Sequence, residues 1–186
     1  LDGRVLDLAS LKSIRHAAST LEDQLDGLLN NAGVMMLPRS LTEDGFEMQL
    51  GVNHLGHFAL SAALMDKLSA NARVVTVSSN AHKPGRIAFD DLMGGHRSRR
   101  LAAYCQSKLA NLLFALELQR RFTEKGSART SVACHPGYSA TNLFFVAPQL
   151  EGRRWLEGAS RLANRFVAQS STQGAWPTVL AATDEE

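Results

Sequence analysis

Two side chains of this sequence, Tyr104 and Lys108, have the types and the spacing to handle a proton together. They lie four residues apart near the start of a predicted helix, so both face the same side. An ammonium group held close to a phenol favours the phenolate, so we expect the pKa of Tyr104 to fall from about 10 toward neutrality. A phenol tuned in this way can give or take a proton at a reacting oxygen, which is general acid–base chemistry.

Small and polar residues follow the predicted strands on either side of this helix. Ser78 and Ser79 come directly after the β-branched run at 73–77, and Asn-Asn-Ala-Gly at 30–33 follows a short apolar run. Open parallel sheets bind ligands at the carboxyl ends of their strands. We therefore expect these strand ends and the helix face that carries Tyr104 to meet at one crevice.

The elements that must position these residues alternate between short apolar runs and longer helical stretches, which is the pattern of a parallel α/β sheet. The predicted strands cover residues 4–6, 28–29, 73–77 and 130–135. The predicted helices run from Ser10 to about Leu25, from Thr42 to Leu68 with a break at Gly51 or Gly56, from Leu101 to Lys125, and onward from about Thr172. No repeat or linker divides the chain, so residues 1–186 are expected to form one domain.

Composition excludes several classes of protein. The 186 residues include 20 Lys and Arg against 18 Asp and Glu, so the chain offers no electrostatic footprint for nucleic acid or an acidic membrane surface. Cys105 and Cys134 are too few for a disulfide scaffold and suit a reducing compartment, which predicts a cytoplasmic protein. No apolar run approaches about 18 residues, so we predict no membrane segment in this chain.

Taken together, the order and spacing of these motifs resemble the short-chain dehydrogenase/reductase superfamily. The resemblance rests on Asp7-Leu8, Asn30 to Gly33, Asn53 in VNHLGHF, Ser79 in VVTVSS, Tyr104 and Lys108 in YCQSK, and Pro136-Gly137 with Thr141. The segments LLNNAGVM, GVNHLGHF and YCQSKLANLLFALEL are most similar to the retinol dehydrogenase and WW-domain oxidoreductase branch and its bacterial relatives. This resemblance implies a Rossmann-type, doubly wound parallel sheet in three α/β/α layers.

The resemblance also implies an oxidoreductase that interconverts a carbonyl and an alcohol with NAD or NADP. Its catalytic residues would be Ser79 at the substrate carbonyl, Tyr104 as general acid and base, Lys108 at Tyr104 and the nicotinamide ribose, and Asn53 at a water in the proton relay. The cofactor contacts would be Asp7 and Leu8 at the adenine, Asn31, Ala32 and Gly33 near the adenosine ribose, Tyr104 and Lys108, and Pro136, Gly137 and Thr141 at the nicotinamide end.

One element of the superfamily is absent from the sequence. A T-G-x-x-x-G-x-G turn, which would cradle the pyrophosphate, does not occur before Asp7. The order of elements implies that the first two strands and the last strand of the family are missing, so residues 4–8 have no strand to pair with. The edge at 26–30 would be apolar and unpaired. We expect an inactive fragment that binds NAD(P) weakly, whose preference between NAD and NADP cannot be read.

Other interpretations stay open at this point. A nucleotide-sugar epimerase-like extended relative also uses Tyr-x-x-x-Lys, and a dinucleotide-sensing or scaffold protein could keep the fold without turnover. His54 and His57 suggest a metal site, but no carboxylate or cysteine cluster completes one, so no metal is predicted.

The substrate is expected to be a small apolar carbonyl or alcohol, covered by residues 144–167. The helix at 101–125 is expected to support a homodimer.

Overall fold

The structure is a computed structural model that describes residues 3, 5–94, 99–136 and 171–184. In chain order its elements are α1 (Leu11–Ser19), β1 (Leu25–Asn30), α2 (Met48–Leu50), the π-helix η1 (Gly51–Gly56), α3 (His57–Leu64), the 3-10 turn η2 (Met65–Lys67), β2 (Leu68–Val77), the 3-10 turn η3 (Asn80–His82), α4 (Arg100–Glu124), β3 (Thr130–Cys134) and α7 (Ser171–Thr183).

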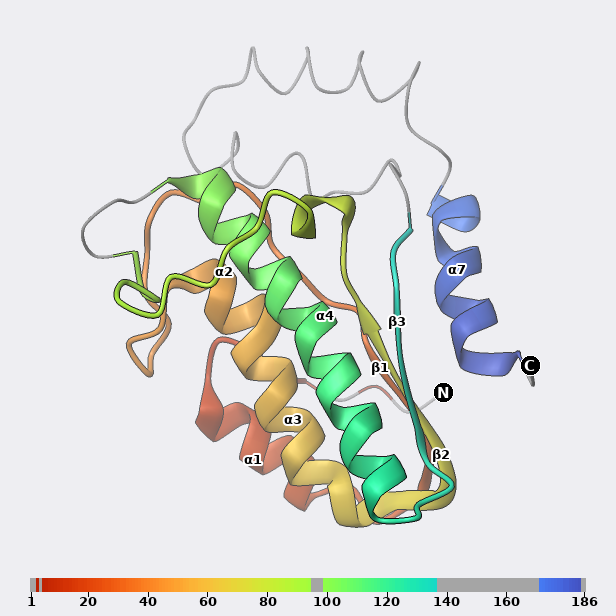
Figure 1. Ribbon diagram of the computed structural model, residues 1–186. Coiled ribbons are helices and arrows are strands. Elements are labelled where there is room, and N and C mark those ends of the chain that lie inside the picture. Colours follow the sequence, from red (N-terminus) through yellow and green to blue (C-terminus); the bar gives the residue numbers. More distant parts are fainter. Residues whose placement is uncertain (1–2, 4, 95–98, 137–170, 185–186) are drawn as a thin grey trace.

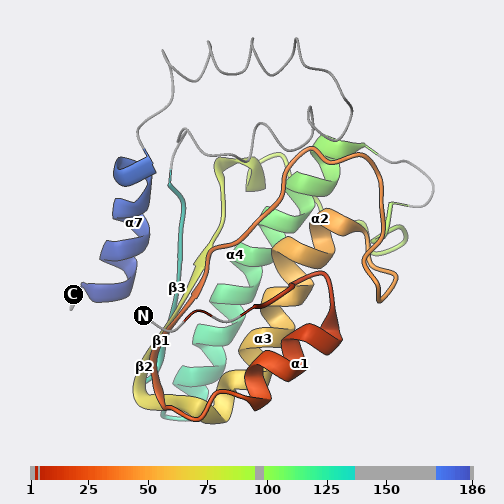
Figure 2. The same cartoon turned by 180° about the vertical axis from the view of Figure 1, so that it is seen from behind.

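The strands of the described residues form one parallel sheet in the order β1-β2-β3. Leu28 of β1 lies opposite Val74 of β2, and Val77 of β2 lies opposite Cys134 of β3. Helices α1, α3 and α4 cover one face of this sheet, while α7 lies on the other face (Figures 1 and 2). This is the predicted doubly wound α/β arrangement with its helices in two outer layers.

The core lies between the sheet and the layer of α1, α3 and α4. Its buried members alternate along β2 and recur at helical spacing on the three helices, as the two periodicities require. They include Ile14, Leu60, Leu64, Ala72, Val74, Leu118 and Phe122. This packing fixes the long helix α4 against β2 and β3 and so fixes the residues that α4 carries toward the ends of the strands.

The prediction of a strand at residues 4–6 is wrong for the described residues 5–7, which form no strand. Val5 is 93% exposed, and no strand of the described residues lies beside it to pair with. A strand with no neighbouring strand has no inter-strand hydrogen bonds, and its backbone groups bond to water instead. These residues therefore have no reason to adopt a strand conformation. The described sheet accordingly has three strands where the sequence indicates four.

Two helix boundaries also differ from the predicted ones. Ser10 caps α1 as expected by accepting a hydrogen bond from the Ser13 backbone N–H, but the helix ends at Ser19 and not near Leu25, because Leu25 already belongs to β1. The helix predicted from Thr42 begins only at Met48. Between them Gly45 (φ +84°) makes a tight turn that brings the Thr42 N–H to the Phe46 carbonyl at 2.8 Å.

The predicted break at Gly51 or Gly56 is confirmed, since these two glycines bound the π-helix η1. A Cβ on Gly56 would lie 2.5 Å from the Leu8 carbonyl oxygen, and a Cβ on Gly51 would lie 2.6 Å from Thr42 Cγ2. Both positions therefore require glycine so that neighbouring chain can approach closely. Short π-helical turns of this kind are often found at functional sites.

Among the described residues, none of the helices is both long enough and apolar enough to cross a bilayer.

Candidate active site

Tyr104 and Lys108 lie on one face of α4, as the spacing predicts, and both side chains are buried, at 6% and 4% exposed. Lys108 Nζ sits over the Tyr104 ring, 5.8 Å from its centroid. Ser79, just beyond the end of β2, hydrogen-bonds to the Tyr104 side chain. The strand end and the helix face therefore meet in the arrangement expected for Ser79, Tyr104 and Lys108.

The expected lowering of the Tyr104 pKa is not what the structure shows. Burial raises the pKa of Tyr104 above its ordinary value, and the hydrogen bond with Ser79 only partly opposes this rise. The physical reason lies in where the ammonium is held. Lys108 Nζ approaches the face of the ring and donates to the Val77 carbonyl at 3.1 Å, and burial lowers the pKa of Lys108 itself to about 8.

Asn53 is fully buried in the π-helix η1, and its side-chain amide is hydrogen-bonded at both ends. Its Oδ1 accepts from the Val34 N–H at 2.7 Å, while its Nδ2 donates to the Val34 carbonyl and to Ser107 Oγ, each at 2.9 Å. Ser107 in turn donates to the Tyr104 carbonyl at 2.7 Å. Asn53 therefore ties the loop after β1 to the turn of α4 that carries Tyr104.

The glycine of the Asn-Asn-Ala-Gly sequence lies directly against this group. A Cβ on Gly33 would stand 3.2 Å from Asn53 Oδ1 and 3.6 Å from Lys108 Nζ. Asn31 and Ala32, next to it, are exposed. The backbone here is thus open to solvent on one side and close to a buried ammonium on the other, which is the geometry of a cradle for a polar ligand.

Asn30, the first residue of that sequence, faces the core and not the cradle. Its Nδ2 donates to Ser61 Oγ of α3 at 3.0 Å, while its Oδ1 and Thr76 Oγ1, its neighbour across the sheet, are buried without a hydrogen-bond partner. This position therefore links β1 to α3.

Asp7 and Leu8 form a turn beside the π-helix. The Asp7 carboxylate accepts from the Ala9 N–H at 2.8 Å, and the Leu8 carbonyl packs against Gly56. Asp7 itself is exposed. Pro136 lies two residues beyond Cys134, the last residue of β3. Gly137 and Thr141, and the expected substrate-covering segment at 144–167, lie outside the described residues.

Two polar side chains that the sequence reasoning did not select belong to the same cluster. Ser107 and Asn111 are both buried on α4, three and seven residues beyond Tyr104. Asn111 Nδ2 donates to the Val77 carbonyl at 3.1 Å, the same oxygen that Lys108 uses. The sequence carries a signal for them, because Tyr104, Ser107, Lys108 and Asn111 form a polar stripe at helical spacing on the buried side of the helix.

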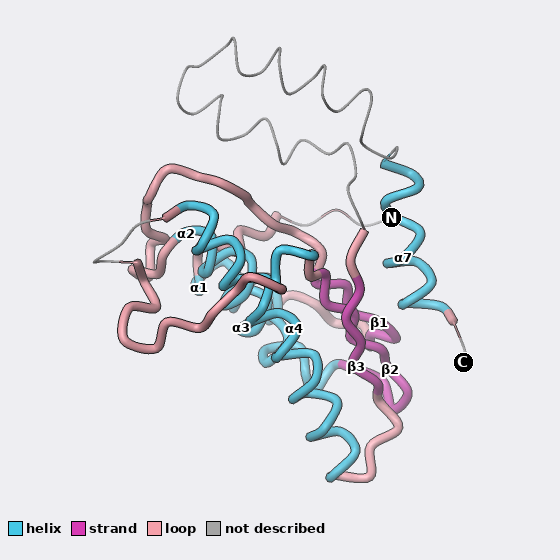
Figure 3. Tube along the Cα trace, turned by 45° about the horizontal axis from the view of Figure 1, so that its top comes forward, coloured by secondary structure: helices cyan, strands magenta, loops and turns pink. Residues whose placement is uncertain are grey.

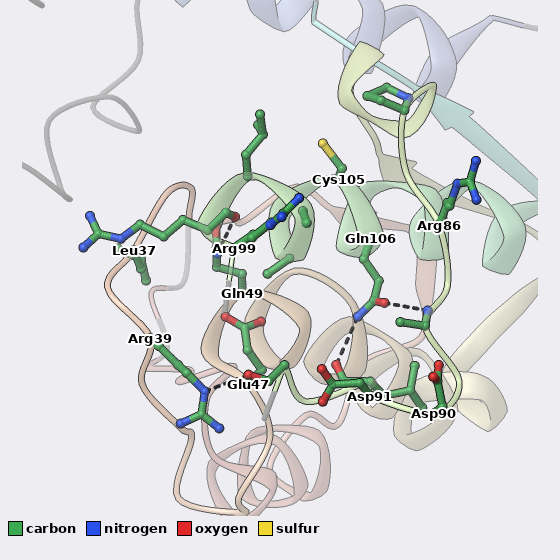
Figure 4. Close-up of a pocket in the computed structure, with 18 residues that line it drawn as sticks. Leu37, Arg39, Glu47, Gln49, Arg86, Asp90, Asp91, Arg99, Cys105 and Gln106 are labelled. Atoms are coloured by element: carbon green, nitrogen blue, oxygen red, sulfur yellow. Dashed lines mark hydrogen bonds between the residues drawn. The ribbon is translucent and has the colours of Figure 1, made fainter. Parts of the chain in front are cut away.

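A cavity of about 920 Å³ lies beside the first turns of α4, on the side that carries Leu101 and Cys105 (Figure 4). The loop at 84–94 forms its far wall, held to the helix by Gln106, which accepts from the Ala88 N–H and donates to the Leu92 carbonyl. Tyr104 does not line it. This cavity is therefore separate from the candidate site, and burial raises the pKa of the Cys105 thiol beside it.

Viewed from the end where the strands terminate, the loops that follow β1 and β2 lie above the strands and beside the start of α4 (Figure 3). This is the edge at which open α/β sheets bind ligands. The described site residues bring together a phenol, a buried ammonium, a hydroxyl and a glycine with open space beside it. This set of groups is suited to acid–base chemistry on a polar ligand.

Comparisons with known proteins point to one family. The model of the family described as short chain dehydrogenase matches residues 2–149. Human retinol dehydrogenase 13 is 54% identical over 149 residues, which cover 77% of this chain and 44% of that protein. The chain thus spans about half the length of the curated relatives it matches.

Solved structures show the same fold. A protein of Mycobacterium paratuberculosis is 45% identical with a TM-score of 0.77, covering 98% of this chain and 59% of that one. A Beutenbergia cavernae protein assigned as an NAD(P)-dependent gluconate 5-dehydrogenase, with NADP bound at low occupancy, is 25% identical with a TM-score of 0.63, covering 98% of this chain and 70% of that one. The chain belongs to the short-chain dehydrogenase family, in the branch that holds the retinol dehydrogenases.

Proposed function

We propose that the full-length protein containing this chain is an NAD(P)-dependent oxidoreductase that interconverts an alcohol and a carbonyl. The observation that carries the proposal is the convergence of the buried Tyr104 and Lys108 with the half-buried Ser79 at the ends of the strands. Membership of the short-chain dehydrogenase family supports it. An apolar alcohol or its carbonyl counterpart is the proposed substrate class, by analogy with human retinol dehydrogenase 13.

In the reductive direction, Tyr104 donates its phenolic proton to the oxygen of the substrate as negative charge develops there. The raised pKa of Tyr104 keeps the phenol protonated at neutral pH, which is the form that this step needs. The Ser79 hydroxyl, already hydrogen-bonded to Tyr104, orients the substrate oxygen toward that proton. In the oxidative direction the same phenolic oxygen must accept a proton.

Lys108 supports both directions through its charge. Its pKa of about 8 leaves it mostly protonated at neutral pH, so a positive charge sits against Tyr104 when the phenolate forms. Asn53 keeps the Tyr104 turn in register with the loop after β1 through Ser107. We infer that Asn53 acts by position, since both ends of its side-chain amide are already bonded to protein groups.

The residues present fit a nicotinamide cofactor. Lys108 Nζ has three N–H donors and one described acceptor, the Val77 carbonyl, so donors remain for ribose hydroxyls. Gly33 leaves open the space beside that ammonium which a Cβ would fill. We propose that Asn31, Ala32 and Gly33 hold the adenosine ribose side and that Asp7 and Leu8 hold the adenine. The bound cofactor supplies or accepts the hydride.

A substrate screen tests this function. The full-length protein is assayed with aldehydes, ketones, retinoids and nucleotide sugars against NADH and NADPH, and with the matching alcohols against the oxidised cofactors. Cofactor binding is titrated on the same samples. Turnover of any of these pairs supports an oxidoreductase. Cofactor binding without turnover across the whole panel supports the dinucleotide-sensing alternative, and turnover of a nucleotide sugar alone supports the epimerase-like one.

The 186-residue chain by itself is proposed to be inactive. Its sequence contains no T-G-x-x-x-G-x-G turn to bind the pyrophosphate through backbone N–H groups. Isothermal titration of the chain with NADH and NADPH checks this directly. Dissociation constants in the low micromolar range for the chain alone would contradict it.

A further inference from the structure

The Val77 carbonyl, at the last residue of β2, accepts hydrogen bonds from two side chains of α4. Lys108 Nζ and Asn111 Nδ2 each lie 3.1 Å from this oxygen. The two residues are three positions apart on the helix and so share one face. Both are buried, so each hydrogen bond stands in a site from which water is excluded.

The orientation of the Asn111 amide follows from this contact. Its Nδ2 must face the Val77 carbonyl, because an amide oxygen in that place would oppose another acceptor. Its Oδ1 therefore points the other way, toward His54 Nδ1 at 3.2 Å. An acceptor on Asn111 requires a donor on His54, which assigns the proton of the His54 ring to Nδ1.

His54 is itself held in place by its neighbours. It lies in the π-helix η1, and its ring contacts the rings of Phe58 and Phe114 with centroids 6.3 Å and 6.2 Å away. Burial lowers the pKa of His54, so the ring stays neutral at physiological pH. A neutral ring fixed in this way presents one N–H donor to Asn111 in a constant direction.

A reversed Asn111 amide would change the surroundings of Lys108. Its oxygen would then face the Val77 carbonyl oxygen, the same atom to which the Lys108 ammonium donates. An amide oxygen in a dry site is a strong acceptor for an ammonium group. Lys108 would gain a second internal acceptor and would offer fewer N–H donors to any ligand.

We propose that His54 is a positioning residue: its Nδ1–H locks the Asn111 amide in the orientation that leaves Lys108 a single internal acceptor and its remaining N–H donors free for ligand. The inference rests on the proposed role of Lys108 in the site and extends it to residues that the acid–base chemistry does not itself use. His54 touches neither Tyr104 nor Ser79 through any hydrogen bond of the described residues.

Other titratable groups also face Lys108 and have to be taken into account. Tyr104 lies beside it on α4, Cys134 lies on β3, and His57 lies on α3. His57 donates through Nδ1 to the Asn53 carbonyl at 2.9 Å, and burial together with the Lys108 charge lowers the pKa of His57. None of these groups contacts the Asn111 amide through a hydrogen bond of the described residues, so they do not fix its orientation.

The test measures the titration of Lys108 in the full-length protein by lysine ¹³Cε NMR, with the signal assigned by its loss in Lys108→Arg. His54→Phe removes the N–H donor but keeps an aromatic ring among Phe58 and Phe114. His54→Asn keeps an N–H at the place of Nδ1. Asn111→Leu removes the amide oxygen that a reversed amide would present. Amide spectra establish that each variant is folded, and His54→Leu, which also lacks an N–H donor, replaces His54→Phe if that variant does not fold.

We expect His54→Phe to raise the pKa of Lys108 by roughly one unit, since hydrogen bonding to the charged form favours that form. His54→Asn should titrate like the unaltered protein, and Asn111→Leu should show no rise. A simple loosening of the core would instead admit water and raise the pKa in both His54→Phe and Asn111→Leu. That pattern, or no shift in His54→Phe, overturns the inference, and neither result depends on whether the protein turns over a substrate.

Discussion

Lys108 Nζ lies over the face of the Tyr104 ring, 5.8 Å from its centroid, and donates its one described hydrogen bond to the Val77 carbonyl. The lysine therefore acts on the phenol through its charge and not through a direct hydrogen bond. Both groups are buried, so this charge is only weakly screened by water. The pair combines a phenol whose pKa is raised with an ammonium whose pKa is lowered.

Burial of the Lys108 charge should lower the free energy of unfolding. The site keeps this charge because its chemistry uses it. The pKa of Lys108 is about 8 in the folded chain and near 10.5 unfolded, so the unfolded state binds more protons between these two values. Stability contributed by this group is therefore lowest below pH 8 and rises as the pH increases toward 10.5. We predict that Lys108→Met raises the free energy of unfolding at pH 7 by on the order of 1–3 kcal/mol.

Urea denaturation of the full-length protein at pH 7 and at pH 10 checks this. The Val77 carbonyl keeps its Asn111 donor in the variant, so no buried acceptor is left without a partner. The advantage of Lys108→Met should shrink at pH 10, where the unaltered protein no longer carries the buried charge. An unchanged or lower stability of the variant at pH 7 would mean that the lysine charge is compensated in the folded state.

Gly33 should be required for cofactor binding. Gly33→Ala places a methyl group 3.2 Å from Asn53 Oδ1 and 3.6 Å from Lys108 Nζ, in the space beside this ammonium that is proposed for the cofactor. We expect the dissociation constant for NAD(P) to rise at least about tenfold, or about 1.4 kcal/mol. Gly27→Ala in β1 is the matched control, because its methyl would meet its nearest atom only at 3.7 Å. Equal affinity in the two variants, measured by titration calorimetry, would remove Gly33 from the cofactor site.

Asn53 should be among the most costly polar residues to remove. Asn53→Ala leaves the Val34 N–H and carbonyl without their side-chain partner in a part-buried site and frees Ser107. Loss of such a network costs about 2–4 kcal/mol. Asn31→Ala, at an exposed neighbouring position, should stay within about 0.5 kcal/mol of the unaltered protein. Denaturant unfolding measures the stability of both variants, from a shift of the midpoint at an unchanged slope. Similar small losses of stability in the two variants would contradict the anchoring role of Asn53.

The outer face of α3 and α4 carries exposed apolar side chains that suit a homodimer. Phe58, Leu113 and Leu116 are about half exposed or more, at 52%, 47% and 61%. We propose that this face pairs with the same face of a second copy, and we expect Leu116→Arg to convert a dimer to a monomer. Light scattering of the full-length protein measures the state, with Arg120→Leu, just beyond the patch, as a control. A strictly monomeric unaltered protein would count against the proposal.

The sequence predicts most of the site because its motifs are tied to elements with clear periodicity. Tyr104 and Lys108 on a long amphipathic helix, and Ser79 after a β-branched strand, lie where the spacing indicates. The pKa of Tyr104 was not predictable in this way. Spacing shows that two side chains share a helix face, but whether an ammonium meets the oxygen or the ring of a phenol depends on packing from β2.

The misplaced boundaries have a similar cause. The absence of a strand at 5–7 depends on pairing partners, and the late start of α2 depends on a turn closed by Thr42 and Gly45. The sequence alone does not single out Asn111 and Ser107, because each is an ordinary polar residue in a helix. Their roles are visible only when the Val77 carbonyl and Asn53 are brought against them by the fold.

The most direct test of the proposed chemistry is Tyr104→Phe in the full-length protein, with turnover and cofactor binding measured on the same sample. The substitution removes the phenolic hydroxyl and keeps the ring beneath Lys108. The account predicts that kcat falls by about 10² to 10⁴ while the dissociation constant for NAD(P) stays nearly unchanged. Undiminished turnover in Tyr104→Phe would show that another group exchanges the proton and would contradict the assignment of Tyr104.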